Sequence, residues 1–108
     1  MVTQEQINDL EVRAKKLDEA INIEQREIDL RNEQERTEEP NFWDNPDKAR
    51  QQLKKVADIK AILDDFAAMC RAVDDLSLIP DFVAEGVITE EEAEGQFASA
   101  LELVEKLE

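Results

Sequence analysis

The chain has 108 residues, the length of about one domain, and its 42% hydrophobic share is enough for a modest core. With 28 acidic and 13 basic side chains, its net charge of −15 excludes broad binding of nucleic acid, because an anionic surface gains nothing from counterion release. The absence of histidine excludes Ser-His-Asp and Cys-His catalysis, histidine metal sites and histidine pH switches within this chain.

The first predicted element is a long helix over about residues 3–36. Thr3 and Gln6 have the spacing of a capping box at its start. Apolar residues then recur at steps of three, four and seven, as in a heptad: Ile7, Leu10, Ala14, Leu17, Ile21 and Ile28. Glu24 and Arg31 occupy the next expected apolar positions, so we expect the contact face to rotate around the helix there.

A corner over residues 37–46 follows, and it concentrates prolines and aromatic residues. Its signature residues are Pro40, Phe42, Trp43, Asp44 and Pro46. Proline disfavours the α conformation in the residue before it, so Glu39 and Asn45 should lie outside helices. Two adjacent rings, each able to bury roughly 150–250 Å², suggest a loop held against a core. Trp43 has the alternative role of anchoring a partner; we favour the structural role.

The second predicted helix covers about residues 46–85, with Asn45 as N-cap and Pro46 as first helical residue. Two adjacent apolar stripes run along it, which is typical of a helix that packs against two partners. Pro80 predicts a disturbance near residues 77–80; we favour a kink near Ser77, and a break of the helix stays open as the alternative. Gly86 is a natural left-handed residue after the helix end.

The third predicted helix covers residues 89–108. Thr89 and Glu92 form a capping-box pattern. Its apolar face comprises Ala93, Phe97, Leu101, Val104 and Leu107. Short links place consecutive helices side by side. The sequence therefore predicts one all-α domain over residues 1–108: an elongated, coiled-coil-like antiparallel hairpin with the third helix packed on it as a three-helix bundle. The sequence does not decide whether the chain self-associates, since heptad faces also pair helices of different chains.

The sequence shows no catalytic, metal or cofactor site, and we expect no enzyme activity and no cofactor. Adjacent carboxylates occur at Asp64–Asp65, Asp74–Asp75 and Glu90–Glu92, but neighbouring helical residues point about 100° apart and do not converge. We interpret Cys70 as a small buried hydrophobic residue; a role as a redox-active thiol is the less favoured interpretation. One cysteine and no leader or long apolar run indicate a cytoplasmic protein without a membrane segment.

The run from Glu38 to Ala49 resembles the Asp/Glu-Pro-x-Phe-Trp-Asp-x-x-x-Lys-Ala segment of the bacterial release factor 2 family of class I peptide chain release factors. The long upstream helix, Leu53-Lys54-Lys55 downstream and the acidic segment at Thr89–Glu92 are similar to forms of that family's N-terminal domain. The resemblance implies an N-terminal helical domain, or a truncated homologue, that acts in translation termination at UGA and UAA codons.

The same resemblance implies protein partners: the stalk base of the large ribosomal subunit and the class II release factor. The family's Gly-Gly-Gln and Ser-Pro-Phe motifs have no counterpart here, so this chain alone should neither read a codon nor release a peptide. We expect no direct nucleic-acid binding and no membrane contact. The alternative hypothesis is a free-standing acidic coiled-coil adaptor without codon recognition.

Overall fold

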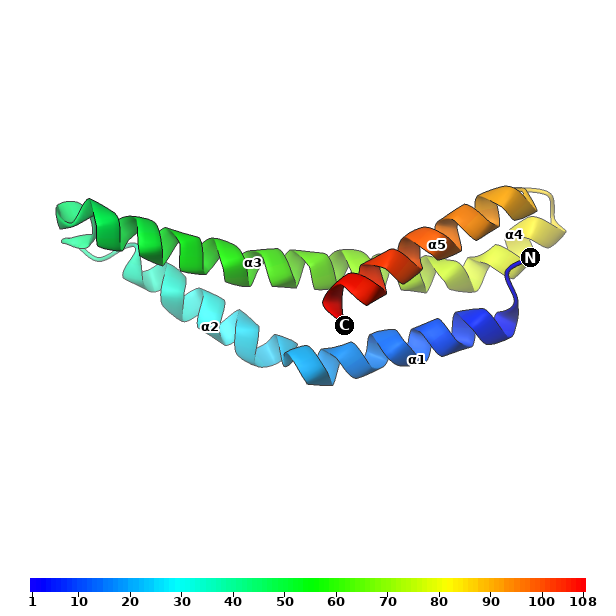
Figure 1. Ribbon diagram of the computed structural model, residues 1–108, viewed down its shortest axis with the longest axis horizontal. Helices are drawn as coiled ribbons and strands as arrows, with labels where there is room; N and C mark the ends of the chain where they lie inside the picture. The colour runs from blue at the N-terminus through cyan, green and yellow to red at the C-terminus, as the bar shows by residue number, and fades with distance from the viewer. The chain divides into compact units, whose positions relative to one another are not determined.

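Every regular element of the chain is a helix, which confirms the predicted all-α class (Figure 1). The computed structural model describes residues 1–108. The α-helices are α1 (Gln4–Ile21), α2 (Ile23–Arg36), α3 (Pro46–Asp75), α4 (Ile79–Ala84) and α5 (Glu90–Leu107). Two short 3-10 helices, η1 (Phe42–Asp44) and η2 (Leu76–Leu78), precede and follow α3. None of these helices combines the length and apolar character needed to cross a membrane.

Contacts within the chain are concentrated in two compact units. Residues 1–20 and 65–108 form one, here called the terminal unit, and residues 21–64 form the other, the hairpin unit. Helix α3 supplies residues to both. The physical reason lies in the distribution of the core, because every buried hydrophobic side chain except Ala49 belongs to the terminal unit.

The terminal unit holds the main core, built by α1, the end of α3, η2, α4 and α5. Its largest fully buried side chains are Ile7, Leu10, Met69, Leu76, Ile79 and Val104. The predicted seam residues Ile7, Leu10, Ala14 and Leu17 are all buried, which confirms the heptad pattern in α1. Burial of each large apolar side chain stabilises the fold by about 1.5–3 kcal/mol.

Exposed ion pairs define the helix directions within the terminal unit. The Met1 ammonium lies 2.6 Å from Glu94, and Arg13 lies 2.5 Å from Glu108, so α1 and α5 run in the same direction. Lys106, near the end of α5, lies 3.2 Å from Asp65 on α3, which places α5 antiparallel to α3. The predicted third helix thus packs along the other two within this unit.

The hairpin unit consists of α2 and residues 46–64 of α3, joined by the corner. The two helices lie antiparallel in Figure 1, coloured cyan and green. Gln52 on α3 donates from Nε2 to the Glu33 backbone oxygen at 2.9 Å and to the Glu33 carboxylate at 2.6 Å. These bonds pair the two helices where few large side chains are buried.

The predicted helix over about residues 3–36 is interrupted at Asn22, which separates α1 from α2. Asn22 has a left-handed backbone, with φ 56° and ψ 64°. Asparagine tolerates this conformation better than most residues. The Arg26 side chain donates from Nε to the Ile21 carbonyl at 2.9 Å, which satisfies an acceptor near the break. The interruption comes just before Glu24, where the apolar seam weakens.

Near Pro80 the helical path is disturbed, as predicted, but it is not interrupted: the backbone stays right-handed helical at Asp75, Leu78 and Ile79 while the helix changes type. Helix α3 ends at Asp75, η2 carries the chain to Leu78, and α4 begins at Ile79. Pro80 lies in the first turn of α4, where its missing N–H group costs no helical hydrogen bond. Helix α4 ends at Ala84, and Gly86 adopts φ 73°, as expected for the left-handed residue after a helix.

Both predicted capping boxes are present. Thr3 Oγ1 accepts from the Gln6 N–H at 3.2 Å, and Gln6 Oε1 accepts from the Thr3 N–H at 2.8 Å. At α5, Thr89 Oγ1 accepts from the Glu92 N–H at 3.0 Å while the Glu92 carboxylate accepts from the Thr89 N–H at 3.4 Å. These bonds satisfy donors at the helix starts that have no intrahelical partner.

Candidate functional site

The corner between α2 and α3 is a series of tight turns. Thr37 Oγ1 donates to the Gln34 carbonyl at 2.6 Å and closes the end of α2. The Phe42 N–H donates to the Glu39 carbonyl at 3.0 Å, and the Asp44 N–H to the Asn41 carbonyl at 3.1 Å. Local backbone bonds therefore determine the path of the corner, so that its apolar rings are not required to hold it.

Asn45 and Pro46 start α3 as the sequence predicts. Asn45 Oδ1 accepts from the backbone N–H groups of Asp47 and Lys48 at 3.1 and 3.2 Å. Pro46 is the first residue of α3, where its fixed φ suits a helix. Ala49, one turn later, is only 1% exposed and is the one buried hydrophobic side chain of the hairpin unit.

Trp43 is not held against a core, which corrects the expectation that its ring pins the corner. Its side chain is 67% exposed, and its ring meets that of Phe42 edge to face, with centroids 4.9 Å apart. Phe42 is half-buried and takes the packing role. The hairpin unit has too small a core to cover two rings, so one stays in water.

The remaining signature residues frame this aromatic pair. Pro40 and Asp44 are exposed, and Pro46 is exposed at the start of α3. The structure therefore places an exposed Trp43 ring against a half-buried Phe42 ring, on a turn that is held by its own hydrogen bonds. Tryptophan in this setting is the residue type that most often dominates binding at protein interfaces.

Glu33 is a residue near the corner that the sequence reasoning missed. Its side chain is 12% exposed and also lies 3.3 Å from Lys55 Nζ and 3.9 Å from an Arg36 nitrogen. The hydrogen bond from Gln52, together with Lys55 and Arg36, lowers the pKa of the Glu33 carboxyl below its ordinary value. Its partner Gln52 is 19 residues away in the chain, and no local pattern marks the pair.

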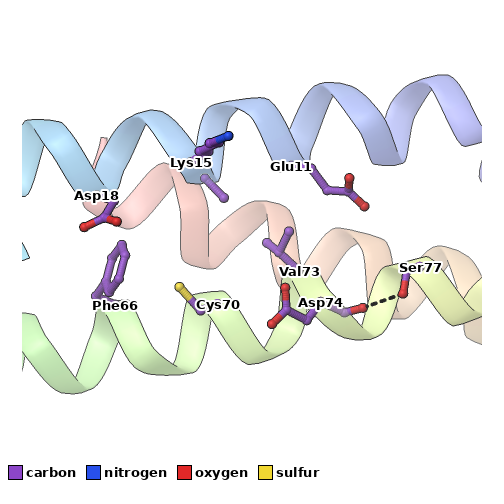
Figure 2. Close-up of a pocket in the computed structure, with 9 residues that line it drawn as sticks. Glu11, Lys15, Asp18, Phe66, Cys70, Val73, Asp74 and Ser77 are labelled. Atoms are coloured by element: carbon purple, nitrogen blue, oxygen red, sulfur yellow. Dashed lines mark hydrogen bonds between the residues drawn. The ribbon is translucent and has the colours of Figure 1, made fainter.

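A cleft of about 480 Å³ surrounds Cys70 in the terminal unit (Figure 2). In the figure, Glu11, Lys15 and Asp18 reach it from α1, and Phe66 and Cys70 from α3. Cys70 is half-buried, so the expectation of a buried residue holds only in part. Partial burial, with Asp74 and Asp18 nearby, raises the pKa of the Cys70 thiol. This environment keeps the thiol protonated and weakens it as a nucleophile.

The paired carboxylates have structural partners or face solvent. Asp65 pairs with Lys106, and Glu92 belongs to the capping box of α5. No group of three or more His, Cys, Asp or Glu side chains is arranged to hold a metal ion.

Fold and site together define an acidic, all-helical protein with an exposed Trp43 ring beside a half-buried Phe42 ring at a helix-to-helix corner. The chain is similar to peptide chain release factor 2 of Staphylococcus aureus strains COL and MRSA252, with 32% identity over 66 residues in each case. The similarity covers 61% of this chain and 18% of each relative, so it spans less than a fifth of the relatives' length. No protein-family model matches the chain.

Proposed function

We propose that the chain is a protein-interaction module of translation termination, equivalent to the N-terminal helical domain of peptide chain release factor 2 or a truncated homologue. The observation that carries the proposal is the 66-residue similarity to that factor. The module works in the cytoplasm and has no enzyme activity or cofactor of its own. Reading of UGA and UAA and release of the peptide belong to other parts of a full-length factor.

The partners in this proposal are proteins: the stalk base of the large ribosomal subunit and the class II release factor. The net charge of −15 supports protein over RNA contact, since phosphates are repelled. Trp43 supports a contact at the corner, because a 67% exposed ring offers apolar area that a partner can cover. The Phe42 ring orients it.

Competition on ribosomes tests the proposal. Bacterial ribosomes stalled at UGA are incubated with full-length release factor 2 and increasing amounts of this chain, and the bound fractions are measured by sedimentation. We expect this chain to bind and to displace the full-length factor. Trp43→Ala should weaken binding by about tenfold or more, as for other aromatic anchors. Val12→Ala, which trims another exposed apolar side chain, is the matched control.

Absence of binding at concentrations that saturate with the full-length factor would contradict the proposal. It would favour the alternative, an acidic adaptor that works away from the ribosome. If Trp43→Ala binds ribosomes as tightly as the parent chain, ribosome binding is supported but the corner is not part of the contact.

A further inference from the structure

A second cleft, of about 440 Å³, lies in the terminal unit between the first residues of the chain, α4 and the start of α5. Most of its lining is apolar, with Val2, Ile79, Pro80, Val83, Ala84 and Ala93. Ile79 and Ala93 are buried and form its floor, whereas Ala84 is exposed. Two further apolar side chains near α4 in the chain are uncovered: Leu78, directly before the helix, is 47% exposed, and Val87, three residues after it, is 61% exposed.

The part of the chain that supplies most of this apolar cleft is rich in carboxylates. The segment from residue 72 to residue 105 contains ten acidic side chains and no lysine or arginine. Glu90 lines the cleft itself, and Asp81 and Glu91 are exposed on α4 and the first turn of α5. Met1 also lines the cleft, and its ammonium is paired with Glu94 at 2.6 Å. The cleft is therefore an apolar site in a strongly acidic part of the chain.

Few occupants match both properties. Nucleic acid and anionic lipid surfaces carry the same charge as the rim. A second copy of this chain brings another −15, so close approach of two terminal units is opposed. A positively charged helix with one apolar face satisfies both, because its apolar side chains fill the slot while its lysines or arginines meet the carboxylates.

We propose that the cleft between residues 1–4, α4 and the start of α5 docks a basic amphipathic helix of a partner protein. This surface belongs to the terminal unit and is separate from the Trp43 corner of the hairpin unit. It goes beyond the function proposed above and does not depend on ribosome binding.

A designed peptide supplies the probe. It is a fluorescein-labelled helix of about four turns with leucine at every i, i+3, i+4 and i+7 position and lysine elsewhere. A second peptide has the same composition, but its leucines are distributed around the helix. Fluorescence anisotropy measures both against the full chain. We expect the amphipathic peptide to bind at least about tenfold more tightly. Equal binding would mean charge attraction alone and would overturn the proposal.

Filling the cleft tests its location. Ala84→Leu adds volume from the exposed side of α4. It should weaken binding of the amphipathic peptide by about tenfold or more. Ala98→Leu makes the same change at an exposed position of α5 outside the cleft and should leave affinity unchanged. Circular dichroism checks that both variants are folded. Unchanged affinity in a folded Ala84→Leu variant would overturn the proposal.

A measurement on the unmodified chain tests the location of the peptide without relying on variants that could misfold. Backbone amide resonances are followed by NMR as the amphipathic peptide is added. Shifts concentrated in residues 79–93 support the proposal, whereas shifts confined to other segments overturn it. Sedimentation of the chain alone gives the last check, since self-association that Ala84→Leu abolishes would make a second copy the occupant and contradict the proposed partner.

Discussion

At the scale of single residues, the largest ring of the chain, that of Trp43, is exposed to solvent. Its exposed fraction of 67% separates it from the core side chains, among which Met69 is fully buried. Its position follows from the short-range hydrogen bonds of the corner and from the edge-to-face contact with Phe42. A ring that packs so little contributes little to stability, which agrees with the proposal that it serves as a contact.

Replacing Trp43 tests that distinction. Trp43→Ala should lower the free energy of unfolding by about 1 kcal/mol or less, because little more than the contact with Phe42 is lost. Met69→Ala is the matched comparison in the core and should cost about 2–5 kcal/mol. Urea unfolding followed by circular dichroism measures both. A loss of about 3–5 kcal/mol for Trp43→Ala would mean that the ring is buried after all.

At the scale of elements, the starts and ends of helices follow from nearby residues. Thr3, Asn45, Thr89 and Gly86 act at the positions that the sequence predicts, because capping and left-handed turns depend on neighbours within three or four residues. The break at Asn22 was not predicted, since asparagine inside a helix is only mildly unfavourable.

Contacts between distant residues were not accessible to the same reasoning. The pairing of Glu33 with Gln52 needs the hairpin to be closed before the two side chains meet. The exposure of Trp43 depends on how much core the hairpin unit assembles, and that is a property of the whole unit. The two clefts likewise appear only once several elements are packed, so the corner was the one part of the candidate site that local sequence marked.

Asn22 offers a test of the helix break. Asn22→Gly should change stability little, because glycine adopts a left-handed backbone readily, whereas Asn22→Ala should cost about 1–2 kcal/mol. Thermal unfolding compares the two variants. If Asn22→Ala proves more stable than the parent chain, residues 4–36 form one continuous helix in solution, contrary to the structure.

Glu33 links α2 to α3, and its contribution to stability should depend on pH. Its pKa is lower in the folded chain than in the unfolded chain, so its carboxylate stabilises the fold above the ordinary glutamate pKa. That contribution is lost as the pH falls through the folded-state pKa. Glu33→Gln should therefore be less stable than the parent at neutral pH, and the difference should shrink in acid.

Urea titrations between pH 7 and about pH 3 measure this dependence. Gln34→Ala, which changes an exposed side chain of the same helix without touching a carboxyl group, is the control, and its stability difference from the parent should not depend on pH. A stability difference for Glu33→Gln that stays constant over the whole range would show that its ionisation does not support the hairpin.

At the scale of the whole molecule, the charge is unevenly distributed. Residues 65–108 contain twelve acidic and two basic side chains, whereas the hairpin unit contains eleven acidic and eight basic ones. Like charges at this density oppose the compact state and favour basic partners. Six residues of this acidic segment, Glu90 among them, line the apolar cleft, so charge and shape there favour the proposed basic amphipathic partner.

Salt should stabilise this chain. Raising the concentration of sodium chloride from about 0.01 M to about 1 M shortens the Debye length from about 30 Å to about 3 Å and screens the repulsion. The melting temperature should therefore rise. Glu102→Lys, which reduces the charge at an exposed position of α5, should gain less from salt. A melting temperature that falls with salt would mean that the exposed ion pairs outweigh the repulsion.

We propose that the corner around Trp43 is a contact surface that is free in the isolated chain and is covered by a ribosomal partner. Trp43 is the only tryptophan, so 5-fluorotryptophan labelling gives one fluorine resonance from this site. In the free chain that resonance should show the solvent isotope shift of an exposed ring, and addition of excess bacterial ribosomes should broaden it beyond detection. A resonance that is already shielded from solvent in the free chain, or that stays sharp with ribosomes in excess, would contradict the claim.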